Sequence, residues 1–397
     1  MQTQDYLRQM EQYSARNYRP LPVVLARGEG AFVWDVEGKR YIDMLSSYSA
    51  LNHGHRHPRL IRALTEQAAR LTLTSRAFHN DQLGPWCEEL AAYARMEMVL
   101  PMNTGAEAVE TALKLARKWA YAVKGIPLNE AEIIVCANNF HGRTITVVSF
   151  STEELYRKQF GPFTPGFQVI PYGNAAAFES ALSDRTAAFL VEPIQGEAGI
   201  LVPPAGYLQT VRELCTRHRV LLLADEIQTG LGRTGARFCS DHEGVRPDIL
   251  ILGKALGGGI FPISAIAGSR ELLGLFVPGE HGSTFGGNPL ACAISREALR
   301  VLEEEHLAES AATLGRFLMG GLREAIGSQA REIRGKGLLI GVEVADGNAR
   351  AWCERLFEVG ILCKETHETV IRFAPPLVVS EAILDEVLSR IARVFSE

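Results

Sequence analysis

Two residues of this chain could act together on one small molecule, namely Lys254 and Asp225. Lys254 comes just after the apolar run 249–252 and stands among several glycines. A lysine whose pKa is lowered by burial can attack an aldehyde and form a Schiff base, and neighbouring glycines let a ligand approach the backbone. Asp225 follows another apolar run, 220–224. We therefore expect an amine and an acid at the carboxyl ends of two core strands.

Each residue also has an ordinary explanation when it is taken alone. Most lysines are solvated surface groups, and an aspartate at the end of a strand commonly caps a turn or a helix. Together, however, they match the two groups that hold a pyridoxal phosphate ring, an amine at its aldehyde and an anion beneath its ring nitrogen. The period of two in a strand places Ile227 on the same side as Asp225. Phe140 is a candidate to stack on the opposite face of the ring, with a plain core position as the alternative.

The segment 101–108, P-M-N-T-G-A-E-A, could bind a phosphate group. It opens a helix that we expect to continue to about residue 121. Thr104 and Glu107 stand in the capping-box relation, and Gly105 and Ala106 leave the N–H groups of the first turn uncrowded. These N–H groups favour an anion, although an ordinary capped helix explains the same pattern.

Two other motifs suggest functions that the surrounding sequence does not favour. Residues 230–235 match the dinucleotide pattern G-x-G-x-x-G, which would indicate a nucleotide-dependent oxidoreductase. The motif begins several residues after the end of the preceding apolar run 220–224, and no convincing helix follows it, so we expect no dinucleotide site. His53, His55 and His57 alternate as metal ligands can, but no nearby acid or cysteine completes a set. We therefore expect no metal site and a polar turn before a helix that begins near Pro58.

The elements that must position these residues follow from the hydrophobic pattern. Strand-like and helical segments alternate between about residues 55 and 300, which predicts an α/β fold with a largely parallel sheet wrapped by helices. We expect an N-terminal segment of a small domain at 1–50, a large cofactor-binding domain at 51–300 and a C-terminal small domain at 301–397. The expected elements are a hairpin over 31–43, strands at 132–136, 187–191, 220–224, 248–252, 338–344 and 370–373, and helices at 104–121, 207–218, 290–326 and from about 380.

Composition and charge exclude several classes of protein. The chain has 397 residues, of which 47% are hydrophobic and 22% charged, and this is the usual globular mix. Its formal charge is -5 and it has no basic run, so we do not expect nucleic acid as a partner. No stretch is long and apolar enough to span a bilayer, so we do not expect a membrane either. The seven cysteines are scattered without a C-x-x-C pair, and no secretion signal is recognisable at residue 1. Both features lead us to expect the cytoplasm.

Several motifs follow one another along the chain in one order. They are N-T-G-A-E-A at 103–108, F-H-G-R-T at 140–144, E-P-I-Q-G-E at 192–197, D-E-I-Q-T-G at 225–230, G-K at 253–254 and H-G-S-T-F-G-G-N-P at 281–289. They resemble the class III (omega) aminotransferases, which are fold-type I pyridoxal-phosphate enzymes, and the resemblance covers about residues 17 to 377. Segments 17–23, 45–50 and 371–377 look most like the ornithine aminotransferases, and the acetylornithine aminotransferases are the nearest alternative.

The resemblance implies a role for each matching residue. It implies a large domain with a mostly parallel sheet and a smaller α+β domain built from both termini. Lys254 would hold pyridoxal 5'-phosphate and carry the proton, while Asp225 would keep the ring nitrogen protonated. Gln228 would approach the ring phenolate. The remaining cofactor contacts would come from Gly105, Ala106, Phe140, Ile227 and, toward the phosphate of a second subunit, Ser283 and Thr284.

The resemblance also implies how the substrates are bound. Tyr18 and Arg143 would hold the α-amino and α-carboxylate groups of ornithine, and Tyr48 would line the same channel. Glu197 would pair with Arg372 until 2-oxoglutarate or glutamate arrives. The expected reaction is transfer of the δ-amino group of L-ornithine to 2-oxoglutarate in a homodimer with the active site at the subunit interface. Acetylornithine, 4-aminobutyrate or the lysine side chain are the alternative amino donors.

Overall fold

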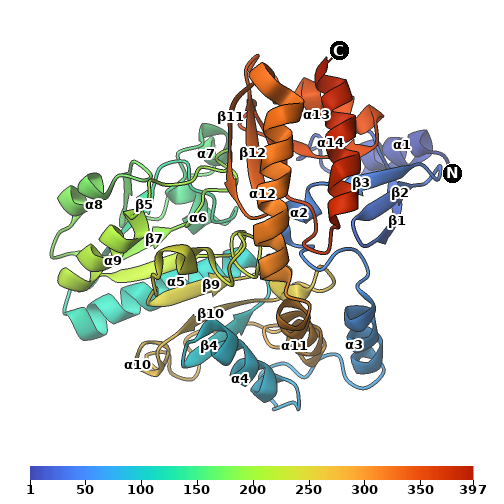
Figure 1. Ribbon diagram of the computed structural model, residues 1–397. Coiled ribbons are helices and arrows are strands. Elements are labelled where there is room, and N and C mark those ends of the chain that lie inside the picture. The colour runs from blue at the N-terminus through green and yellow to red at the C-terminus, as the bar shows by residue number, and fades with distance from the viewer. Residues whose placement is uncertain (397) are drawn as a thin grey trace.

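The centre of the molecule is a seven-stranded sheet. The computed structural model describes residues 1–396, and the strand order in this sheet is β4-β10-β9-β8-β7-β5-β6 (Figure 1). Strands β6, β5, β7, β8 and β9 are parallel, whereas β10 runs antiparallel to both β9 and β4. The prediction of a largely parallel sheet is confirmed. The strands are β4 (Met98–Met102), β5 (Glu132–Cys136), β6 (Phe167–Ile170), β7 (Thr186–Val191), β8 (Leu221–Asp225), β9 (Ile249–Leu252) and β10 (Ser264–Gly268).

Helices cover both faces of this sheet. Along β5, Ile133 and Val135 pack in one apolar cluster with helix α5, Gly105–Trp119, whereas Ile134 and Cys136 pack in another with helix α9, Tyr207–Arg217. Alternate residues of a strand point to opposite faces, so a strand that is covered on both sides must be apolar throughout. This requirement explains the uninterrupted apolar runs that the sequence shows.

Two four-stranded sheets lie outside the central one. The sheet β1-β2-β3-β13 contains the predicted N-terminal hairpin, and its last strand comes from the C-terminal part of the chain, so blue and red segments lie together in Figure 1. The other sheet has the order β11-β12-β15-β14. Their strands are β1 (Leu25–Glu29), β2 (Phe32–Asp35), β3 (Arg40–Asp43), β11 (Ala330–Lys336), β12 (Leu339–Val344), β13 (Ile361–Leu362), β14 (Lys364–Thr366) and β15 (Val370–Phe373).

The single long helix predicted over 290–326 is wrong, because two helices occupy this range. Helix α11 ends at Glu304, and His306 has φ 51°, a left-handed value that turns the chain before α12 begins. The remaining helices include the predicted closing helix. In order they are α1 (Thr3–Tyr13), α2 (Ser46–Ser49), α3 (Pro58–Ala68), α4 (Leu83–Ala94), α6 (Ile145–Ser149), α7 (Glu154–Arg157), α8 (Ala175–Ala181), α10 (Arg270–Leu273), α11 (Pro289–Glu304), α12 (Leu307–Ile326), α13 (Ala349–Glu358) and α14 (Glu381–Ser396).

The glycine-rich motif at 230–235 packs against the C-terminal part of the chain. No α-helix follows it directly, since the next regular element is the short 3-10 turn Cys239–Glu243. Gly235 has φ 87°, and a Cβ atom there would lie 2.9 Å from Ala312 of α12. The fully buried Arg233 donates hydrogen bonds to the carbonyl oxygens of Leu338 and Pro375. The motif therefore serves packing between segments, and a dinucleotide site there is not supported.

The three alternating histidines each contact a protein group. His53 Nε2 lies 3.0 Å from the carbonyl oxygen of Ala298, and His55 Nε2 lies 2.8 Å from Asp43. His57 precedes helix α3, whose first residue is Pro58, as the sequence predicts. Proline suits this first helical position because its missing N–H would have no partner there.

Within residues 1–396, no helix combines the length and apolar character that a membrane span requires.

Candidate active site

The carboxyl ends of β8 and β9 bring Asp225 and Lys254 into one cavity. The two strands pair in parallel with Asp225 opposite Ile251, so Lys254 follows only a few residues beyond that level. The cavity has a volume of about 180 Å³. Lys254 has φ 45°, a left-handed value that costs a non-glycine residue roughly 1–2 kcal/mol. The residues that line the cavity are Gly105, Ala106, Phe140, His141, Gly142, Glu192, Ile194, Asp225, Ile227, Gln228, Thr229 and Lys254.

The amine of Lys254 is available for chemistry. Within residues 1–396 it makes neither a hydrogen bond nor an ion pair. Burial lowers the pKa of Lys254, and the negative charges of Glu197 and Asp225 counter part of this shift. A lowered pKa increases the uncharged fraction of the amine at neutral pH, and only the uncharged amine attacks an aldehyde.

Asp225 is held by a buried histidine. Nδ1 of His141 lies 2.6 Å from Oδ2 of Asp225, and Oδ1 accepts the backbone N–H of Ile227 at 3.1 Å. Burial alone would lower the pKa of His141, but the hydrogen bond to Asp225 and its charge outweigh burial and raise the pKa. A protonated His141 would fix the orientation of the carboxylate and favour its charged form. The sequence does not indicate this contact, because the two residues are 84 positions apart.

Sequence reasoning also misses Glu192, although it opens the motif at 192–197. Its buried carboxyl accepts the backbone N–H of Phe140 at 3.0 Å and lines the same cavity. Burial raises the pKa of Glu192 to about 7; the charge of His141 opposes this shift and that of Asp225 adds to it. A third titratable side chain therefore stands beside the Asp225–His141 pair.

The N-terminus of helix α5 forms another wall of the cavity. The predicted capping box is confirmed, since Thr104 N–H donates to Glu107 at 2.7 Å and Glu107 N–H donates back to Thr104 at 3.3 Å. Gly105 allows a close approach, because a Cβ atom there would lie 2.9 Å from Ile227. The first-turn N–H groups beside Gly105 and Ala106 thus remain accessible to an anion. Asp225 and Ile227 both line this cavity, but β8 ends at Asp225 and Ile227 lies in the turn that follows, so the expected strand period of two is not what places them together.

A second cavity of about 930 Å³ shares Phe140, Gln228 and Lys254 with the first. It has the size and position of a substrate channel that leads to Lys254. All five predicted substrate residues line it, namely Tyr18, Tyr48, Arg143, Glu197 and Arg372.

Arg372, Glu197 and Gln228 form a closed set of hydrogen bonds at the junction of the two cavities. Nη1 of Arg372 lies 2.8 Å from Oε1 of Glu197, and Nη2 lies 2.7 Å from Oε1 of Gln228. The amide of Gln228 completes the set by donating to Glu197 at 2.9 Å. The arginine side chain is only 1% exposed and that of Glu197 is 23% exposed. The predicted pairing of Glu197 with Arg372 is therefore present as a contact in this structure.

Tyr48 lies in a strained segment of the chain. Residues 46–49 all have positive φ, with values of 50°, 46°, 60° and 71°. Left-handed residues other than glycine cost roughly 1–2 kcal/mol each and persist where the surroundings hold them. The ring of Tyr48 lies 5.3 Å from the guanidinium carbon of Arg372, so the segment brings this ring to the buried arginine.

Two predicted cofactor residues lie away from both cavities of this chain. Ser283 accepts a hydrogen bond from the side chain of Asn103 at 2.7 Å, and Thr284 is exposed. Neither residue is among those that line the two cavities. Their predicted role belongs to a second subunit, and it stays a prediction.

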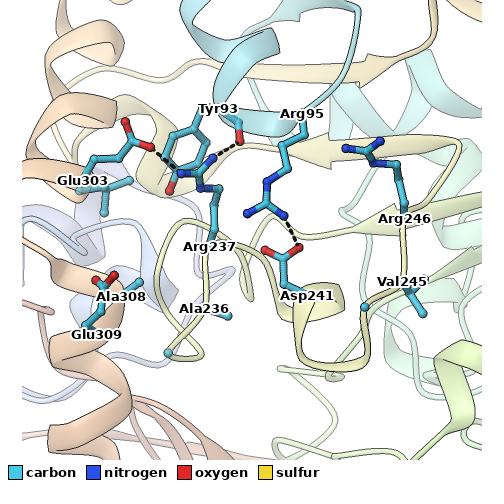
Figure 2. Close-up of a pocket in the computed structure, with 13 residues that line it drawn as sticks. Tyr93, Arg95, Ala236, Arg237, Asp241, Val245, Arg246, Glu303, Ala308 and Glu309 are labelled. Carbon is cyan, nitrogen blue, oxygen red and sulfur yellow. Dashed lines mark hydrogen bonds and ion pairs between the residues drawn. The ribbon is translucent and has the colours of Figure 1, made fainter.

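Another cavity, of about 760 Å³, lies near the end of helix α4 (Figure 2). Arg237 pairs there with Glu303 at 2.6 Å, and Arg95 pairs with Asp241 at 3.5 Å. None of the candidate catalytic or cofactor residues lines it. Its size alone does not make it the active site, because two of its guanidinium groups already form ion pairs with acidic side chains of the chain.

Comparison with known proteins agrees with the geometry. The family model of the class-III aminotransferases matches residues 13–395. The chain belongs to this family. An ornithine aminotransferase of Geobacillus sp. (strain WCH70) is 59% identical over 394 residues, which are 99% of each chain. The solved ornithine aminotransferase of Toxoplasma gondii has a TM-score of 0.98 at 50% identity and covers 100% of this chain and 94% of its own. The solved acetylornithine aminotransferase of Elizabethkingia anophelis has a TM-score of 0.91 at 48% identity, with coverage of 100% and 99%.

Class-III aminotransferases use pyridoxal phosphate, and the smaller cavity offers groups that fit it. The Toxoplasma gondii structure is described with this cofactor at its active site. In the present chain, the buried carboxylate of Asp225 suits a protonated ring nitrogen, and the free amine of Lys254 suits the aldehyde. The N-terminus of α5 suits the phosphate. The donor set of this aminotransferase therefore matches the ring nitrogen, the aldehyde and the phosphate of the cofactor.

Proposed function

We propose that this chain transfers the δ-amino group of L-ornithine to 2-oxoglutarate. The products are L-glutamate and glutamate 5-semialdehyde, which cyclises to pyrroline-5-carboxylate and links arginine with proline metabolism. The observation that carries the proposal is the contact between Glu197 and Arg372 at 2.8 Å in the cavity that reaches Lys254. While Arg372 is paired with Glu197, it does not bind a carboxylate beside the reacting amine, so donors with such a carboxylate are disfavoured. Ornithine, which reacts through its δ-amine, does not need that contact.

The cofactor site is assigned from the smaller cavity. Pyridoxal phosphate, when bound, supplies a ring that withdraws electrons from the bond to be broken in the substrate. The carboxylate of Asp225 holds a proton at the ring nitrogen, and His141 holds Asp225 in place. Nζ of Lys254 takes the proton from the substrate carbon and returns it. Phe140 and Ile227, which both line this cavity, would cover the two faces of the ring and exclude water.

The remaining cofactor contacts are assigned to four backbone or side-chain groups. The N–H groups at Gly105 and Ala106 would bind the phosphate, and Ser283 and Thr284 would reach the phosphate held by a second subunit. This assignment makes the enzyme a homodimer with its active site at the subunit interface. The exposed position of Thr284, outside the cavities of its own chain, supports it.

The substrate roles follow from the larger cavity. The phenol of Tyr18 binds the α-amino group of ornithine, Arg143 binds its α-carboxylate, and Tyr48 lines the channel between them. When 2-oxoglutarate enters, Glu197 leaves Arg372, which then binds the carboxylate next to the reacting carbon. Arg143 takes the distant carboxylate of the same substrate. One cavity thereby accepts two differently charged molecules in turn.

The domain limits and the compartment complete the proposal. We assign residues 1–50 and 301–397 to the small domain and 51–300 to the large one. The pairing of β13 with β3, which joins the two ends of the chain in one sheet, supports this division. All seven cysteines are unpaired and six are buried, which fits the reducing cytoplasm.

A panel of amino donors tests the proposed function. The purified enzyme with pyridoxal phosphate and 2-oxoglutarate is given ornithine, N-acetylornithine, 4-aminobutyrate or lysine, and glutamate is measured. The highest kcat/KM is expected for ornithine, with the cyclised product detected by mass spectrometry. Faster reaction with N-acetylornithine would favour the alternative that the Elizabethkingia anophelis relative represents.

A further inference from the structure

Arg143 packs against two aromatic rings that also contact each other. Its guanidinium carbon is 3.5 Å from the centroid of the Tyr156 ring and 5.3 Å from that of Phe140. The two rings meet edge to face at 6.1 Å. All three residues line the substrate cavity, and within residues 1–396 no acidic side chain forms an ion pair with Arg143. The positive charge of Arg143 therefore faces the cavity without a direct ion pair to a carboxylate of the chain within residues 1–396.

The stacked arrangement determines which part of the arginine remains free. A ring at 3.5 Å covers one flat face of the guanidinium group. The N–H groups point outward in the plane of the group, so stacking leaves them free for two parallel hydrogen bonds to a carboxylate. Stacking also restricts a long side chain that would otherwise lose rotational freedom on binding its ligand.

Tyr156 is well placed to hold this arrangement. It belongs to the short helix α7, Glu154–Arg157, which begins where Glu153 accepts the backbone N–H of Leu155 at 3.2 Å. Its ring contacts Phe140, which lines both the cofactor cavity and the substrate cavity. The position of Arg143 is thereby tied to a residue that also borders the cofactor.

We propose that Tyr156 is a positioning residue for substrates that carry a carboxylate remote from the reacting carbon. It holds Arg143 with its N–H edge toward the α-carboxylate of ornithine and, in the second half-reaction, toward the distant carboxylate of 2-oxoglutarate. This inference rests on the proposed function and adds the element that selects such substrates. The ring of Tyr156, and not its hydroxyl group, supplies the contact.

The test compares ornithine with 1,4-diaminobutane, which has the same chain between its amines but no carboxylate. Tyr156→Leu is expected to raise KM about fivefold for ornithine and for 2-oxoglutarate while kcat is retained, because a cation–ring contact contributes about 1 kcal/mol. The kcat/KM for 1,4-diaminobutane should stay unchanged. Tyr156→Phe keeps the ring and should remain within about twofold of the parent enzyme.

Phe160→Leu is the matched control, since Phe160 follows Tyr156 closely in the chain, is 55% exposed and lines neither cavity. It should change none of these constants. Equal losses with ornithine and 1,4-diaminobutane in Tyr156→Leu would overturn the inference, as would a Tyr156→Phe variant as impaired as Tyr156→Leu. A parent enzyme that does not use ornithine would contradict the proposed function itself, whereas an active parent with equal losses contradicts only the role of Tyr156.

Discussion

Replacement of Glu197 by alanine is expected to change which amino donor the enzyme prefers. In the structure the carboxylate of Glu197 engages a buried Arg372 at 2.8 Å. Glutamate carries a carboxylate beside its reacting amine and must displace Glu197 to reach this arginine. Under the proposed function, ornithine reacts through its δ-amine and would leave the pair intact. Glu197→Ala should therefore speed the reaction with glutamate and reduce the preference for ornithine.

The size of this change follows from the contact that is removed. A hydrogen bond between charged groups contributes about 1.5–3 kcal/mol, and each 1.4 kcal/mol corresponds to a factor of about ten. The side chain of Glu197 is 23% exposed, so water replaces part of the lost contact and the lower end of the range applies. We expect the ratio of ornithine to glutamate single-turnover rates to fall about tenfold.

Rapid mixing of the cofactor-loaded enzyme with each donor, followed by absorbance of the cofactor, measures both rates. Glu368→Ala is the matched control, because Glu368 is an exposed carboxylate of the same cavity without a contact to Arg372. Its ratio should equal that of the parent. An unchanged ratio in Glu197→Ala would refute the gating role of the pair. Arg372→Ala should in turn slow the 2-oxoglutarate half-reaction far more than the ornithine one.

The pH dependence of the preference provides an independent measurement. Burial alone would raise the pKa of Glu197, but the charges of Arg372 and Lys254, with the hydrogen bond from Gln228, lower it below the ordinary carboxyl value. A carboxyl whose pKa is lowered by folding keeps its ion pair above that pKa and loses it only as the pH falls through it. The donor preference should therefore be constant from pH 8 to about 5. A loss of preference near neutral pH would contradict the assignment.

Three further substitutions test the cofactor and substrate residues. Lys254→Ala should lose turnover, and borohydride should attach the cofactor mass to the Lys254 peptide in the parent alone; label on another lysine would overturn the assignment. Asp225→Asn should retain the cofactor but lose most of its activity, since the anion at the ring nitrogen is gone, and near-parental turnover would show that the ring is misplaced. Tyr18→Phe should raise KM for ornithine more than for 2-oxoglutarate, which lacks the α-amino group; equal changes in steady-state assays would count against it.

The position of the central site could be predicted because its residues directly follow buried strands. Lys254 and Asp225 come after uninterrupted apolar runs, and parallel strands present their carboxyl ends at one edge of a sheet. The cap at Thr104 and Glu107 is local as well, since both of its hydrogen bonds join residues three positions apart. Local patterns of this kind are readable in a single sequence.

Contacts between distant parts of the chain could not be predicted in this way. The antiparallel β10 resembles a parallel strand in sequence because both of its faces are buried. The break between α11 and α12 depends on one left-handed residue, His306, which has no glycine or proline to signal it. The contact of His141 with Asp225 and the stacking of Tyr156 on Arg143 arise only when separate segments fold together.

Gln228 connects the Glu197–Arg372 pair with the proposed cofactor ring. Its amide oxygen accepts from Arg372 at 2.7 Å and one amide N–H donates to Glu197 at 2.9 Å, and the residue lines both cavities. A glutamine amide has two N–H donors, so the second remains for the ring phenolate while the first binds Glu197. Gln228 can therefore contact the ring and the Glu197–Arg372 pair at the same time. When a substrate carboxylate takes the place of Glu197 on Arg372, the amide N–H of Gln228 loses Glu197 as its acceptor. The side chain of Gln228, which also borders the proposed ring, must then change its conformation.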